Sequence, residues 1–154
     1  MRFPLAAALL AAALVPGTAL AQTPLKTAVD GTFAPHAMPK LEGGIQGFNV
    51  DLANEIAKRL KRSIEIAATQ FSGILPSLQA GTIDFVAAPV TVTKERADNY
   101  IFTEGYLNTD YQFLTKKGEP AITDLKQLKG KVISVNKGSA YDSWAVTTHL
   151  SAAM

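Results

Sequence analysis

Short apolar runs alternate with helical stripes of apolar residues along much of the chain, a pattern typical of α/β proteins. The run at residues 25–29 predicts a buried strand, and the following Asp30 and Gly31 predict a turn. From Phe48 onward, apolar residues recur at spacings of three and four, which predicts a helix with Asn49 as its N-cap. Acidic residues come early in this helix and basic residues late, an order that complements the helix dipole.

The same alternation continues through two more units. Further strands are predicted at residues 63–68, 83–90 and 100–102, and further helices at residues 74–78 and 93–99. The run at 83–90 is almost continuously apolar, which is typical of a central parallel strand buried on both faces. We therefore expect a parallel sheet with right-handed crossovers and with sites at the carboxyl ends of its strands.

A second, smaller strand and helix series follows residue 106. It consists of predicted strands at 111–115 and 132–135, a short helix at 124–128, and a final helix that Gly138 and Ser139 open. The two series predict one α/β unit followed by part of another.

Residues 1–21 have the three parts of a secretory signal peptide. Arg2 precedes an apolar run over residues 5–15, and the small-residue sequence 19–21 precedes Gln22. The run is too short to span a bilayer, and the proline and glycine after it disfavour the alternative of a buried helix. Cleavage after residue 21 predicts an exported protein without a transmembrane segment.

Composition narrows the classes of function. The 154 residues carry 15 Lys and Arg against 13 Asp and Glu, a net charge of +2 that argues against nucleic acid as a partner. Cysteine is absent, which excludes disulfides, zinc–cysteine sites, thiol catalysis and an N-terminal lipid-modified cysteine. His36 and His149 have no ligands at metal-binding spacing, so we interpret them as surface or hydrogen-bonded polar residues. Without a nucleophile–base set or a phosphate loop, the sequence favours binding over catalysis, with no metal or cofactor.

Residues 91–96 follow directly on the apolar run that ends at Val90. Hydroxyl groups, amides at a helix start and the Arg96 guanidinium are thereby predicted at the carboxyl end of a strand, a combination that fits a carboxylate. In the alternative interpretation, Arg96 pairs with Glu95 or Asp98 on the helix surface, and the residues alone leave both open.

Several blocks of sequence occur in order at consistent spacing. They are residues 47–57 (GFNVDLANEIA), 71–81 with Asp84, 91–106 and 128–139. Together they resemble the bacterial extracellular solute-binding proteins of family 3, the polar amino-acid receptors of ABC importers, and most of all the glutamine-binding type. The resemblance runs from about Leu25 to Trp144, with an asparagine at position 49 where the family usually has an acid.

This resemblance implies a type II periplasmic-binding-protein-like fold of two lobes. Lobe 1 would comprise residues 22–107, and residues 108–154 would form the hinge crossing and an incomplete lobe 2. The implied partners are a polar amino acid and the membrane permease of an ABC transporter, in the periplasm and without nucleic acid.

The resemblance also implies a ligand site between the lobes. Arg96 would clamp the ligand α-carboxylate with help from Thr91, and the Pro89 carbonyl would accept from the α-ammonium. Phe33 and Phe71 would stack on the ligand side chain, although ordinary core roles remain an alternative for both. The remaining implied ligand-facing positions are Asp30, which would face the polar end of the side chain, and Asn136, Ser139 and Ala140 of lobe 2.

The family's second lobe is longer than the portion this sequence contains. We therefore expect either a truncated product with weak binding or a short receptor that completes its lobe by dimerising. Two further interpretations stay open: a periplasmic cyclohexadienyl or arogenate dehydratase on the same scaffold, and a non-functional remnant.

Overall fold

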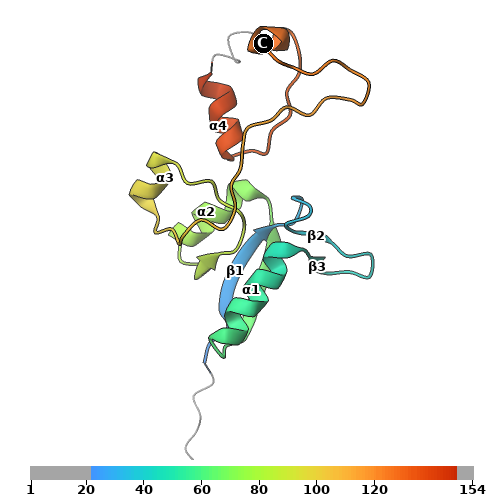
Figure 1. Cartoon of the computed structure of the whole chain (residues 1–154). Helices are drawn as coiled ribbons and strands as arrows, with labels where there is room; N and C mark the ends of the chain where they lie inside the picture. The colour runs from blue at the N-terminus through green and yellow to red at the C-terminus, as the bar shows by residue number, and fades with distance from the viewer. Residues whose placement is uncertain (1–21, 149–154) are drawn as a thin grey trace, which may run out of the picture.

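A three-stranded parallel sheet forms the centre of the N-terminal half in the computed structural model, which describes residues 22–148. Its order is β4 (Ile64–Thr69), β1 (Leu25–Asp30), β5 (Phe85–Val86), and Figure 1 shows β1 beside the helix α1. β1 pairs with all six residues of β4 on one side and with both residues of β5 on the other. The predicted α/β fold with a parallel sheet is confirmed, whereas the predicted signal peptide lies outside the described residues.

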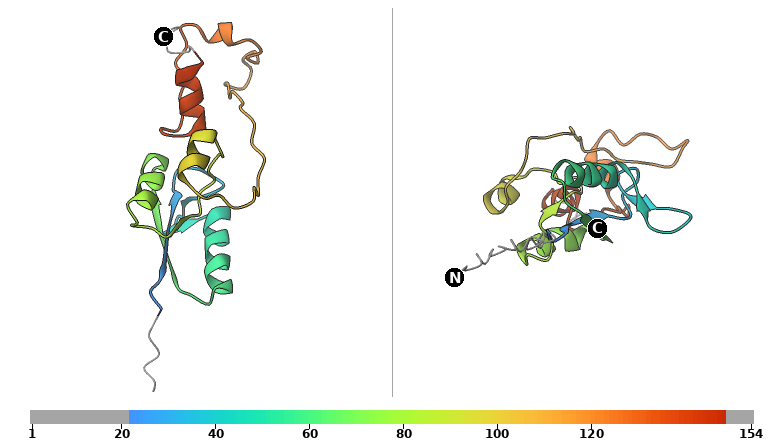
Figure 2. Two further views of the ribbon diagram at one scale, coloured as in Figure 1. Left: turned by 90° about the vertical axis from the view of Figure 1, so that its left-hand side faces the viewer. Right: turned by 90° about the horizontal axis from the view of Figure 1, so that it is seen from below.

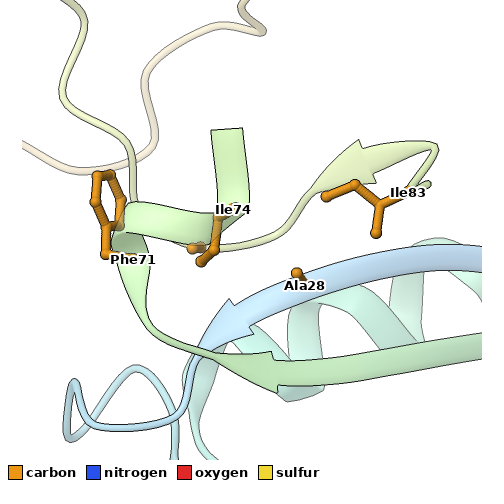
Figure 3. Close-up of a cluster of buried hydrophobic side chains, with 5 residues drawn as sticks. Ala28, Phe71, Ile74 and Ile83 are labelled. Carbon is orange, nitrogen blue, oxygen red and sulfur yellow. The ribbon is translucent and has the colours of Figure 1, made fainter. Parts of the chain in front are cut away.

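Helices cover both faces of this sheet. Neighbouring residues of a strand point to opposite faces, and Ala28 packs against α2 (Phe71–Gln79) while Val29 packs against α1 (Phe48–Arg59). Figure 2 shows the two helices on either side of the strands, and Figure 3 shows the Ala28 side of the core with Phe71 and Ile74. Burial of these apolar side chains at about 25 cal/mol per Å² is the main stabilising term.

The strand predicted at residues 83–90 is only partly formed. β5 contains two residues and lies at an edge of the described sheet, so the prediction of a long central strand is wrong. The Thr27 hydroxyl explains the early end, because it donates to the Phe85 carbonyl at 2.8 Å and accepts from the Ala87 amide at 3.1 Å. The Thr27 side chain thus takes the place of backbone-to-backbone hydrogen bonds between β1 and the residues after β5. The chain then leads to the cleft described below.

The predicted N-cap of α1 is also wrong. Gly47 is the N-cap, and the first helical amides of Phe48 and Asn49 donate to the carbonyls of Pro35 and His36 at 3.1 and 2.9 Å. These loop carbonyls replace a side-chain cap, and the Asn49 side chain is instead fully buried. The loop between β1 and α1 includes a small hairpin, formed by β2 (Met38–Pro39) and β3 (Ile45–Gln46).

Three short elements follow the sheet. α3 (Lys94–Asn99) has Thr93 as its N-cap, η1 (Leu125–Leu128) has Asp124 with a capping box, and α4 (Ala140–Thr147) has Ser139, so each begins close to its predicted start. Figure 1 shows the chain leaving α3 and running away from the sheet, and it shows α4 beginning near the N-terminal half and pointing away from it again. No helix within residues 22–148 has the length and apolarity needed to cross a bilayer.

The strands predicted at 100–102, 111–115 and 132–135 are absent from the described part of the chain. Their apolar side chains are largely exposed, and Val132 keeps 98% of its accessible surface. A strand needs a partner for its backbone groups, and none of the described segments pairs with these three. Apolar sequence therefore predicted strands that the tertiary structure does not form.

We expect Gly47→Ala to lower the free energy of unfolding by more than about 2 kcal/mol. Gly47 has a φ of 134°, and a Cβ there would lie 2.5 Å from the His36 carbonyl oxygen. Gly43→Ala is the matched control, because Gly43 also has a positive φ but no atom within 4 Å of its Cβ position, and should cost about 1 kcal/mol. Urea denaturation measures both, and equal losses would contradict the close-approach explanation.

Candidate functional site

A cleft of about 1550 Å³ lies between the carboxyl ends of the strands and the C-terminal part of the chain. Phe33 follows β1, Phe71 follows β4, and Pro89 and Thr91 follow β5, so each strand contributes through the segment after its carboxyl end. Parallel strands bring these ends to one edge of the sheet. Eight of the nine sequence-predicted site residues line this cleft: Phe33, Phe71, Pro89, Thr91, Arg96, Asn136, Ser139 and Ala140.

The Arg96 guanidinium is held in a fixed position at this cleft. It donates to the Thr91 carbonyl at 3.0 Å and to the Gly138 carbonyl at 2.9 Å. Its Cζ atom lies 5.6 Å from the centroid of the Phe71 ring, a cation–π arrangement. The alternative in which Arg96 pairs with Asp98 on the surface of α3 does not form, because Asp98 pairs with Lys94 at 3.1 Å.

The two predicted aromatic contacts have different environments. Phe71 is 6% exposed and belongs to the core cluster with Ala28 and Ile74, so it has the core role left open above while also lining the cleft. Phe33 is 39% exposed and stacks on His36 at a ring-centroid distance of 4.9 Å. The exposed face of Phe33 is therefore the more available of the two for an incoming molecule.

Asp30 is 1% exposed and does not line the cleft. The amide and hydroxyl of Thr32 donate to its carboxylate at 3.0 and 2.7 Å, and the Asn136 amide donates to its other oxygen at 2.6 Å. Burial alone raises the pKa of Asp30, but the hydrogen bonds from Thr32, Asn136 and the Phe71 backbone outweigh burial and lower that pKa. The Asn136 amide thus satisfies one oxygen of the Asp30 carboxylate, although the two residues lie 106 positions apart in the sequence.

Residues 136–139 form the contact between the C-terminal part and the sheet. Gly138 accepts from Arg96, and a Cβ at Gly138 would lie 3.3 Å from the Cα atom of Ser72. Ser139 and Ala140 are buried at the start of α4, where the Ser139 hydroxyl accepts from the Asp142 amide at 3.2 Å. The Ser139 hydroxyl therefore caps this helix while its residue lines the cleft.

Sequence reasoning did not assign His36 to the site, nor the buried Asn49 that contacts it. His36 lines the cleft beside Phe33, and its Nδ1 lies 2.9 Å from Oδ1 of the buried Asn49. The Asn49 amide donates to the Ala87 carbonyl and, at 3.0 Å, to the Tyr106 hydroxyl. The sequence signal that could have identified His36 was its position, because it lies three residues after Phe33 in the loop that follows β1. No cluster of three or more metal-binding side chains occurs between residues 22 and 148.

Residues 25–149 match the sequence pattern of the bacterial extracellular solute-binding proteins, family 3. This match extends over most of the chain, and the parallel α/β fold agrees with it. The chain belongs to this family, as its resemblance in several separate blocks predicted.

Named relatives bind amino acids. The lysine/arginine/ornithine-binding periplasmic protein of Escherichia coli is 31% identical over 124 residues, which cover 80% of this chain and 48% of the relative. The L-cystine-binding protein of the same species is 35% identical over 121 residues, covering 78% and 46%. A solved structure of an ancestral arginine-binding protein bound to arginine has a TM-score of 0.79 at 34% identity, covering 87% of this chain and 59% of that one. The chain spans about half the length of the curated relatives it matches.

The lowered pKa of Asp30 predicts a loss of stability in acid. Because the folded pKa lies below the unfolded value of about 4, the contribution is complete above that value and disappears as pH falls through the folded pKa. We expect Asp30→Asn to be less stable at neutral pH and to lose less stability between about pH 4 and pH 2.

Thermal unfolding across this pH range provides the measurement. Asp98→Asn is the control, since the Asp98 side chain is 62% exposed and pairs with Lys94 at the surface. It should keep the acid-side slope of the wild type. If Asp30→Asn also keeps that slope, the hydrogen bonds to Asp30 do not stabilise its ionised form.

Proposed function

We propose that this chain binds a free L-amino acid in the cleft, with Arg96 holding the α-carboxylate, as the receptor component of an amino-acid ABC importer. The observation that carries the proposal is the guanidinium fixed between two carbonyls and an aromatic ring at the edge of the cleft. Such fixing removes rotamer freedom before binding and lowers the entropy cost of capturing a ligand.

Arg96 retains donors for a carboxylate. A guanidinium has five N–H groups, and its contacts within residues 22–148 use one toward Thr91 and one toward Gly138. The remaining groups are sufficient for the paired hydrogen bonds that arginine makes to carboxylates. Thr91 and Pro89 line the same cleft, where the Thr91 hydroxyl would assist at the carboxylate and the Pro89 carbonyl would accept from the α-ammonium.

The ligand side chain would extend toward Phe33 and Phe71. Both rings line the cleft, and Phe33 has the more exposed ring. Asp30 would act at the polar end of that side chain through Asn136, to which it is hydrogen bonded. The relatives' names support an amino acid as the ligand class, and they name binding proteins rather than enzymes.

We propose the division into lobes that the family resemblance implies, with residues 22–107 as lobe 1 and residues 108–154 as hinge crossing and part of lobe 2. Two long-range hydrogen bonds support contact between these parts, from Asn136 to Asp30 and from Arg96 to Gly138. A ligand that touches both parts would favour the closed arrangement. We also propose removal of residues 1–21, a periplasmic location and a membrane permease as partner, for which periplasmic relatives provide support.

We expect Arg96→Ala to weaken amino-acid binding by about 100-fold or more, since removing one partner of a buried charged pair costs several kcal/mol. Isothermal titration calorimetry with a panel of amino acids, including arginine, glutamine and cystine, measures the effect. Arg59→Ala is the matched control, because Arg59 is exposed and pairs with Glu55 on α1, away from the cleft. Circular dichroism should show both variants folded.

Binding by Arg96→Ala with wild-type affinity would contradict the assignment of the carboxylate to Arg96. Turnover of prephenate or arogenate by the wild type would instead favour the dehydratase interpretation. A wild-type chain without a cooperative thermal transition would favour the non-functional remnant.

A further inference from the structure

His36 occupies a position at the cleft that its local contacts fix. Its ring stacks on Phe33 at 4.9 Å with an interplanar angle of 30°, and Phe48 meets it edge-on at 6.3 Å. Its Nδ1 atom lies 2.9 Å from Oδ1 of Asn49. Since Asn49 has no exposed surface, this hydrogen bond is anchored in the interior, while His36 itself is half-buried and lines the cleft.

The contacts of Asn49 determine which nitrogen of His36 carries a proton. The Ala87 carbonyl is only an acceptor, so the Asn49 atom that meets it must be the amide nitrogen. That nitrogen also donates to the Tyr106 hydroxyl, which leaves Oδ1 as the atom facing His36. A carbonyl oxygen accepts and does not donate, and therefore Nδ1 of His36 is the protonated nitrogen.

The neutral imidazole then carries a lone pair on Nε2. The two nitrogen directions of an imidazole ring diverge widely, so Nε2 is directed away from buried Asn49, and it is not among the buried unpartnered side-chain atoms of residues 22–148. Within residues 22–148, the hydrogen bond of the His36 side chain is the one to Asn49. An acceptor is thus available beside the exposed ring of Phe33.

We propose that His36 is a specificity-determining residue, which accepts a hydrogen bond at Nε2 from an N–H group on the ligand side chain. This inference rests on the proposed function and deepens it by naming the ligand class. Phe33 offers a flat apolar surface and His36 an acceptor next to it, a combination that suits a planar side-chain group with N–H donors, such as an amide or a guanidinium. A side-chain carboxylate has no proton to share with the Nε2 lone pair and is disfavoured.

Asn49 is the positioning residue in this arrangement. Its side chain joins the loop that holds His36, the residue Ala87 directly after β5, and Tyr106. An aspartate here would place a carboxylate oxygen against the Ala87 carbonyl. The asparagine is therefore the residue that lets this position donate to Ala87 and still accept from His36.

The test compares side chains of similar length on the full chain and on His36→Phe, which retains an aromatic ring. Calorimetry with glutamine, arginine, glutamate and methionine is expected to show a loss of about 10-fold for glutamine and arginine in the variant, the value of one hydrogen bond. Affinity for methionine should change by less than about twofold, and the preference of the wild type for glutamine over glutamate should diminish.

The outcomes separate this inference from the proposed function. Equal losses for all ligands in His36→Phe, or no loss for any, would overturn the role of His36 while Arg96→Ala still tests the carboxylate site. If the wild type binds none of the four amino acids, both proposals are wrong.

A second measurement uses the wild-type protein and therefore does not depend on whether a variant folds. Nitrogen-15 NMR of the neutral wild-type imidazole should show the proton on Nδ1 and none on Nε2, with the Nε2 signal alone shifting when glutamine is added. A neutral ring with its proton on Nε2, or an Nε2 signal that glutamine does not change, would overturn the proposal.

Discussion

The buried carboxylate at the end of β1 is the interaction on which the rest of the structure depends. A buried charge is expensive unless hydrogen bonds compensate it, and Asp30 accepts from Thr32 and from Asn136, which lies 106 positions later. Thr32 shapes the turn that leads to the cleft, and Asn136 holds the C-terminal part against the sheet. One ionised group therefore ties the local turn to the long-range contact.

The same short segment of the C-terminal part organises the basic side of the cleft. Gly138 supplies a carbonyl to Arg96, and its lack of a Cβ permits close approach to Ser72. With the Thr91 carbonyl and the Phe71 ring, this carbonyl fixes the guanidinium without neutralising its charge. A fixed cation at a cleft edge, with no carboxylate paired to it among residues 22–148, attracts anions, which is the physical basis for the proposal that it holds a carboxylate.

Burial differs strongly between the two parts of the described chain. Ala28, Val29 and Ile74 are covered where helices lie on both faces of the sheet, whereas Leu114 and Val132 remain exposed. The exposed residues lie in segments that would be strands by their composition but that pair with no other segment of residues 22–148. Sheet formation depends on a second strand, and the amino acids of one segment do not provide it.

Much of the fold followed from local patterns. The first strands and helices, the parallel sheet and the helix starts near Thr93 and Ser139 were predicted because periodicity is a short-range property, and the family was predicted from its resemblance in several blocks of sequence. The family resemblance implied nine site residues, and eight of them line one cleft.

Tertiary structure alone decided the rest, because it depends on which distant atoms meet. The hydroxyl of Thr27 shortened β5, and two loop carbonyls capped α1 in place of Asn49. Because loop carbonyls cap α1, the Asn49 side chain is available to hydrogen bond His36. From the sequence, His36 was interpreted as an ordinary polar side chain. By itself, the sequence determined the elements and the family, whereas long-range contacts determined which polar groups are satisfied inside and which remain available in the cleft.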